Sequence, residues 1–90
     1  MLFSFINYLK HEKRASNHTV TAYSKDLEQF SHFVAEVFGL EPHAAGHAEI
    51  RAWRIELMES GLSPASVNRK TATLRAFFKF LLQSGKIDAD

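Results

Sequence analysis

Two short segments of the chain share a pattern of hydroxyl groups that could bind phosphate. Residues 16–21 and 63–68 both read Ser-x-x-(Thr/Ser)-Val followed by a polar residue, and each stands where a helix can begin. The first hydroxyl can cap the helix, and the second follows three residues later beside backbone N–H groups that lack partners within the helix. Such a helix start is a natural phosphate site. One copy is usually an ordinary cap, but two copies that each lead into a basic segment favour phosphate binding.

The basic residues are concentrated in two zones that the net charge of +1 conceals. Residues 10–25 hold four Lys or Arg and one acid, and residues 60–86 hold five Lys or Arg and no acid. Residues 26–59, between them, hold seven acids against Arg51 and Arg54. If the fold brings the basic zones together, the chain presents a positive face to a polyanion. Charge alone leaves open the alternative that these residues segregate by chance on solvated faces.

No residue pattern predicts catalysis or metal binding. Tyr8 and Tyr23 lie on apolar helix faces, so we interpret them as packing aromatics rather than nucleophiles. His43 and His47 have the spacing of a metal-ligand pair, but Pro42 and Gly46 predict a loop there and no third ligand cluster follows. We therefore expect no enzymatic activity in these ninety residues, no metal and no cofactor.

Composition predicts a single small domain in a reducing compartment. Ninety residues, 46% of them hydrophobic, can bury one core, and the absence of cysteine excludes disulfides and thiolate metal sites. The apolar start of the chain lacks a basic region and is interrupted at Asn7 and Lys10, so it predicts neither a signal peptide nor a membrane span. We expect a cytoplasmic protein without a membrane partner.

The periodicity of apolar residues predicts an all-α fold of four helices. We expect helices over residues 2–12, 17–38, 47–60 and 64–83. The first ends in the polar stretch Lys13-Arg14-Ala15, and glycine, proline or a capping serine marks the bounds of the other three. Trp53 is expected in the core, and the helical wheel places Phe80 near the outer face, where it could meet another domain or protomer. The expected core stripe of the second helix is Val20, Tyr23, Leu27, Phe30, Val34, Val37 and Phe38.

The fourth helix has a comparable stripe and an opposite face of small and basic residues. Small residues let a helix approach a groove floor closely, while Arg and Lys reach bases or phosphates. Its expected core residues are Val67, Thr71, Leu74, Phe77, Phe78, Leu81 and Leu82. The residues expected to face away from the core are Ala65, Arg69, Ala72, Thr73 and Ala76.

Two motifs resemble the N-terminal core-binding domain of tyrosine recombinases of the Xer and phage-integrase type. The first is Ser16-x-His-Thr-Val-x-Ala-Tyr-x-x-Asp-Leu-x-x-Phe30, and the second is Gly61-Leu-Ser-Pro-Ala-Ser-Val-Asn-Arg-Lys70, continued by Leu74-Arg-Ala-Phe-Phe-Lys-Phe-Leu81. The resemblance covers nearly the whole chain. It implies a SAM-like orthogonal four-helix bundle whose second and fourth helices enter the major groove of duplex DNA.

The resemblance also implies which residues contact DNA. Lys70 projects near the core edge and would have to bend outward to a phosphate. Thr21 and Ser24 stand where relatives often carry basic residues, which leaves the second helix weakly positive. The implied DNA-binding residues are Ser16, His18, Thr19, Thr21, Ala22, Lys25, Ser63, Ala65, Ser66, Asn68, Arg69, Lys70 and Thr73.

By the same resemblance, residues 1–86 form the DNA-binding domain and residues 87–90 begin a linker to a catalytic domain. The implied partners are double-stranded DNA, the catalytic domain of the same full-length chain, and other recombinase protomers in a tetrameric synapse. A helical protein–protein adaptor of the death-fold or SAM type is the alternative, because oppositely charged faces also suit self-association.

Overall fold

The computed structural model describes residues 2–85, which form four α-helices and one short 3₁₀ turn without any strand. The helices are α1 (Leu2–His11), α2 (Asn17–Phe38), α3 (His47–Glu59) and α4 (Pro64–Gln83), and the turn η1 (Pro42–Ala44) precedes α3. The predicted all-α fold is confirmed, and the predicted helix boundaries agree to within one residue. The proposed linker, residues 87–90, and Lys86 lie outside the described residues, so the predicted domain boundary stays a prediction.

The helix ends follow the capping rules that predicted them. Ser16 caps α2 and Ser63 caps α4, and in each case the side chain accepts a hydrogen bond from the backbone N–H three residues later. Gly39 caps the end of α2, and its φ of 66° lies in the left-handed region that glycine adopts readily. Pro64 occupies the first turn of α4, where its missing N–H costs no hydrogen bond.

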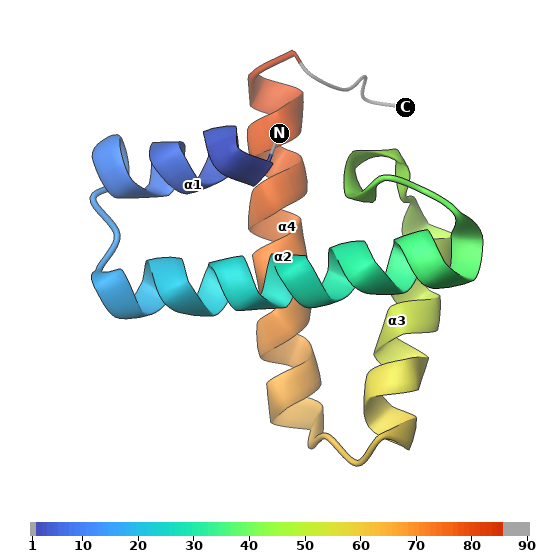
Figure 1. Cartoon of the computed structure of the whole chain (residues 1–90). Coiled ribbons are helices and arrows are strands. Elements are labelled where there is room, and N and C mark those ends of the chain that lie inside the picture. Colours follow the sequence, from blue (N-terminus) through green and yellow to red (C-terminus); the bar gives the residue numbers. More distant parts are fainter. Residues whose placement is uncertain (1, 86–90) are drawn as a thin grey trace.

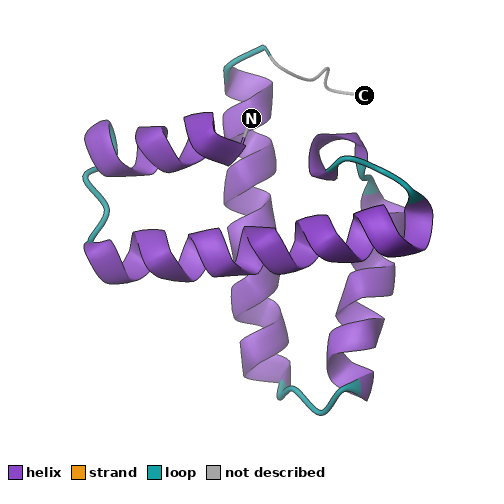
Figure 2. Ribbon diagram, viewed as in Figure 1, coloured by secondary structure: helices purple, strands orange, loops and turns teal. Residues whose placement is uncertain are grey.

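The two longest helices cross near their middles, and the other two each cover one side of the crossing (Figure 1). α1 lies beside the first half of α2, and α3 lies beside the first half of α4. Short loops join consecutive helices, as Figure 2 shows in teal. Among the described helices, none covers the quadrant between the first half of α2 and the first half of α4 in this view. The first halves of α2 and α4, which carry the residues predicted to contact DNA, therefore border one open quadrant (Figure 1).

Aromatic side chains form the centre of the core. Phe5, Phe30 and Phe77 are fully buried, and the ring of Phe5 packs edge-on against Phe77 with 5.5 Å between centroids. Trp53 of α3 is buried against Phe30 of α2 at 5.2 Å, as predicted for a core residue. Tyr8 and Tyr23 both stack on Phe5, which confirms their interpretation as packing aromatics.

Several expectations about which residues face the core are wrong. Val37 and Phe38 are 59% and 41% exposed, and Leu82 is exposed as well, although Val34 and Leu81 on the same helices are fully buried. Phe80 does not face outward, since its ring packs on those of Phe5 and Tyr8, with centroid distances of 5.5 and 4.9 Å. α1 covers that side of α4 and supplies the two rings.

Within the part of the chain that the structure describes, no helix combines the length and the apolar character that crossing a membrane requires.

Candidate nucleic-acid interface

The starts of α2 and α4 have the same hydrogen-bonded geometry. Ser16 Oγ accepts from the Thr19 N–H at 3.1 Å and donates to Thr19 Oγ1 at 3.0 Å. Ser63 Oγ accepts from the Ser66 N–H at 3.2 Å and donates to Ser66 Oγ at 3.2 Å. The two caps are confirmed, and each gathers two hydroxyls and the free N–H groups of a helix start at the surface. Phosphate binding at these positions stays a prediction.

The thirteen residues nominated for DNA contact divide into three groups by exposure. Seven of them are exposed, namely Ser16, His18, Thr21, Lys25, Ser63, Ala65 and Asn68. Among these, the side chains of Ser16, Ser63 and Asn68 are already hydrogen-bonded within the fold. Arg69 is also exposed, but its side chain is engaged within the fold. Thr19, Ala22 and Ser66 are half-buried, while Lys70 and Thr73 are buried.

Asp26 of α2 collects three of the nominated side chains of α4 at the helix crossing. Its carboxylate is 1% exposed and accepts from Arg69 twice, at 2.7 Å from Nη1 to Oδ2 and at 3.1 Å from Nη2 to Oδ1. Lys70 Nζ donates to Oδ1 at 2.9 Å, and Thr73 Oγ1 donates to Oδ2 at 2.8 Å. Hereafter we call these four residues the Asp26 cluster. It joins the acidic middle of the sequence to the second basic zone.

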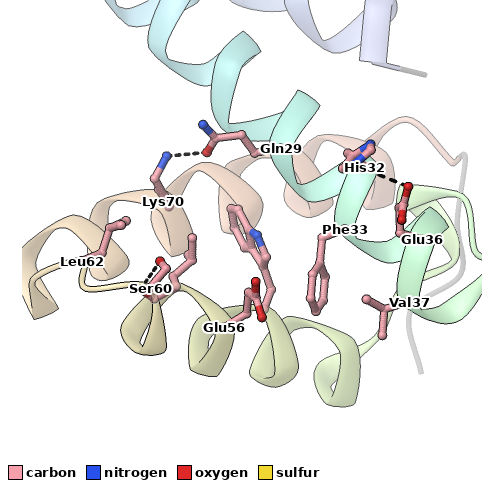
Figure 3. Close-up of a pocket in the computed structure, with 11 residues that line it drawn as sticks. Gln29, His32, Phe33, Glu36, Val37, Glu56, Ser60, Leu62 and Lys70 are labelled. Carbon is pink, nitrogen blue, oxygen red and sulfur yellow. Dashed lines mark hydrogen bonds and ion pairs between the residues drawn. The ribbon is translucent and has the colours of Figure 1, made fainter.

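This cluster corrects the expectations for Thr73 and Lys70. Thr73 is fully buried rather than on the outer face, because its hydroxyl donates to the carboxylate. Lys70 bends inward rather than outward, and its ammonium also donates to Gln29 Oε1 at 2.6 Å, as the dashed line in Figure 3 shows. Both side chains satisfy a buried charge in this fold, as buried ionic groups require.

The protonation of Asp26 is governed by two opposing effects. Burial raises the pKa of this carboxyl, but the hydrogen bonds from Arg69, Lys70 and Thr73 outweigh burial and hold the pKa below its ordinary value. Folding therefore stabilises the charged carboxylate form of Asp26. The resulting stabilisation is present above the unfolded pKa of about 4 and is lost as the pH falls through the folded pKa.

We expect the free energy of unfolding to fall below pH 4 more steeply in the wild-type chain than in Asp26→Asn, which has no carboxyl to titrate at this position. Urea unfolding followed by circular dichroism at pH 6, 4 and 3 measures the difference in slope. Equal slopes in the two proteins would show that the carboxyl of Asp26 contributes nothing to the acid sensitivity.

Arg54 of α3 is not among the residues predicted to contact DNA, but it bonds to one of them. Its guanidinium donates to Thr71 Oγ1 at 2.6 Å and to Asn68 Oδ1 at 3.3 Å, both on α4. Arg54 thereby ties α3 to a nominated contact residue and orients the Asn68 amide. Its partners lie in a helix that the sequence did not place beside it, so no local pattern reveals the contact.

A groove of about 480 Å³ lies between α2 and α3 and extends to Leu62, just before the start of α4, and to Lys70 (Figure 3). Phe33, Trp53 and Leu57 contribute apolar lining, while Glu36 and Glu56 add two acids from opposite helices. Lys70 of α4 lines the same groove, so its charged lining is mixed rather than positive. His43 lies in η1 and His47 begins α3, and residues 2–85 contain no group of three or more potential ligands that could hold a metal ion.

Comparison with known proteins identifies the class of domain. Residues 2–85 match the family model described as "Phage integrase, N-terminal SAM-like domain", so the chain belongs to that family. It is 36% identical to the tyrosine recombinase XerC of Chlorobaculum tepidum over 97% of the present chain, and 39% identical to that of Oceanobacillus iheyensis over 97%. No solved structure matches the chain.

The chain spans about 28% of the length of these curated relatives. The match is thus to one domain of longer recombinases, and the resemblance read from the two motifs is confirmed at that level. The family assignment does not favour the adaptor alternative.

Proposed function

We propose that this chain is the DNA-binding module of a tyrosine recombinase and that it docks duplex DNA against the open quadrant between α2 and α4. The observation that supports this most is the matched geometry of the two capped helix starts, which border that quadrant on crossing helices. Helix starts of this kind bind phosphate through backbone N–H groups and hydroxyls. Two such sites on one face would set the register of a duplex.

The exposed side chains between the helix starts suit a major groove. Lys25 on α2 and Arg69 on α4 supply positive charge, and Ala65 and Ala72 keep the α4 surface low enough for close approach. Arg69 is the residue we assign to base reading, with guanine as its partner, because arginine pairs with guanine through two parallel hydrogen bonds. Thr73 and Lys70 lie beneath this surface and hold Asp26, which in turn contacts Arg69.

The chemistry belongs to the longer protein in this proposal. The relatives are named tyrosine recombinases, so the parent of this domain would break and rejoin DNA strands with a separate catalytic domain. That catalytic domain and further protomers assembled on DNA, as a tetrameric synapse, are the partners. The present domain would contribute site recognition and half of a clamp, with weak affinity alone, because encircling the duplex supplies much of the binding energy of a two-domain protein.

A titration with a 30-base-pair duplex of random sequence tests the proposal. At 50 mM salt we expect the amide resonances of residues 19–25 and 65–69 to shift most, and we expect affinity to fall at 200 mM salt because phosphate contacts release counterions. Five contacts would lower the affinity by a factor on the order of 10²–10³ over that range. Shifts centred on the acidic groove residues Glu36 and Glu56 would contradict the proposed orientation, and no shift at 50 mM salt would contradict DNA binding.

A further inference from the structure

The contact between Arg69 and Asp26 restricts how Arg69 can meet a ligand. Both terminal nitrogens of the guanidinium donate to Asp26, one to each carboxylate oxygen, at 2.7 and 3.1 Å. A planar guanidinium held at two points cannot rotate about its bonds without breaking one of them. Since Asp26 is itself held by Lys70 and Thr73, the orientation of Arg69 is set by α2 as well as by its own helix.

The contact leaves one edge of the guanidinium available. Arginine has five N–H groups, and two of them are used by Asp26. The Nε–H and the adjacent Nη–H form the remaining parallel pair. The Arg69 side chain is 51% exposed while that of Asp26 is 1% exposed, so a ligand reaches Arg69 from the surface and not through the carboxylate. The spacing of two parallel N–H groups matches O6 and N7 of guanine.

Asp26 orients Arg69 without cancelling its attraction for DNA. The cluster contains one carboxylate and two cationic side chains, Arg69 and Lys70, which leaves one net positive charge. The Lys70 side chain is 11% exposed and its ammonium lies 2.9 Å from Asp26 Oδ1, so its charge offsets that of Asp26 inside the fold. The uncompensated charge belongs to the exposed Arg69. This accounts for a lysine in the core, where lysine is rarely found without a partner.

We propose that Asp26 is a positioning residue for sequence recognition: it holds Arg69 so that only the Nε–H edge faces DNA. The inference rests on the proposed DNA-binding function. A guanidinium that is oriented before binding loses less conformational entropy and can select a base edge, whereas a released one reaches any nearby phosphate. Asp26 therefore favours selectivity at the expense of general affinity for DNA.

The decisive comparison is between Asp26→Asn and Glu28→Gln. Each substitution removes one negative charge from α2, but Glu28 is exposed and has no recorded contact with Arg69. Binding to a labelled 30-base-pair random duplex is measured by fluorescence anisotropy at 50, 100 and 200 mM salt. In parallel, each protein selects sequences from a randomised duplex pool, with Arg69→Ala as the reference for lost base reading.

We expect Asp26→Asn to bind the random duplex more tightly than Glu28→Gln does, although it is the less stable protein. One additional phosphate contact by the released Arg69 would steepen the salt slope by about 0.9, equivalent to about eightfold in affinity at 0.1 M salt. Its selected pool should lose the guanine preference found with the wild type, as should the pool of Arg69→Ala. Equal affinities and slopes for the two variants, with an unchanged guanine preference, would overturn the proposal.

A measurement on the wild-type chain covers the case in which Asp26→Asn does not fold. Restricted rotation should give Arg69 separate, slowly exchanging Nη resonances, and these should persist in the DNA complex while the Nε–H resonance shifts. Averaged Nη resonances in the complex would mean that Arg69 leaves Asp26 on binding, which overturns the proposal. If the wild type binds no duplex at 50 mM salt, the proposed DNA-binding function is contradicted. If the wild type binds but the two variants behave alike, only the role of Asp26 is contradicted.

Discussion

Asp26→Ala is expected to lower the free energy of unfolding by about 3–5 kcal/mol, because it leaves the buried ammonium of Lys70 without its carboxylate partner. Lys70 keeps only the neutral oxygen of Gln29, and Thr73 loses the acceptor of its buried hydroxyl. Both losses carry the desolvation cost of an unsatisfied group. Urea unfolding at pH 7 measures the change.

Two further variants separate this effect from a general loss of charge. Glu28→Ala, on the exposed side of α2, should change stability by less than about 0.5 kcal/mol. Adding Lys70→Met to Asp26→Ala should recover part of the loss, because the uncompensated cation is removed while an apolar stem of similar length remains. A double variant as unstable as the sum of the two single variants would contradict the pairing.

Phe5→Ala is expected to cost about 3–5 kcal/mol and to detach α1 from the rest of the fold. Phe5 is fully buried and its ring meets four other aromatic rings, those of Tyr8, Tyr23, Phe77 and Phe80. Truncation leaves a cavity between three helices that rigid rings cannot fill by small movements. Chemical denaturation gives the magnitude, and hydrogen exchange of the α1 amides shows whether this helix separates first.

Phe3→Ala is the matched control for this prediction. It is the same substitution two residues away on the same helix, but Phe3 is 77% exposed and has little to lose. We expect a change below about 0.5 kcal/mol. Equal losses from the two substitutions would mean that helix propensity, and not the aromatic packing of Phe5, holds α1 in place.

The helices were predictable because their signals are local. The serine caps, Pro64 and the glycines at the ends act within one turn, so they predicted the bounds of α2, α3 and α4, while the apolar stripe of residues 2–12 predicted α1. The outer ends of the core stripes were not predictable in the same way. Val37 lies on the apolar stripe of α2 but extends beyond the crossing, and periodicity does not show where a neighbouring helix stops covering a face.

The candidate site was predicted in part. The two capped helix starts could be read from Ser16 and Ser63, whereas the role of Asp26 was missed although this residue stood in the quoted motif. A signal was present, because Asp26 follows Tyr23 by three residues and precedes Phe30 by four, which places a carboxylate on the core face. Its partners lie 43 to 47 residues away, beyond the reach of any local pattern.

The Asp26 cluster also fixes the position along each helix at which α2 and α4 cross. If α4 moved along its axis by one turn, about 5.4 Å, the carboxylate of Asp26 would face side chains that cannot pair with it. Only one relative position of the two helices is therefore favourable. Ser16 lies ten residues before Asp26, and Ser63 lies seven residues before Lys70. Measured along the helix, the crossing is therefore roughly 15 Å from the start of α2 and roughly 10 Å from the start of α4. The two capped helix starts are thus held at a fixed separation, because both are attached rigidly to the same crossing point.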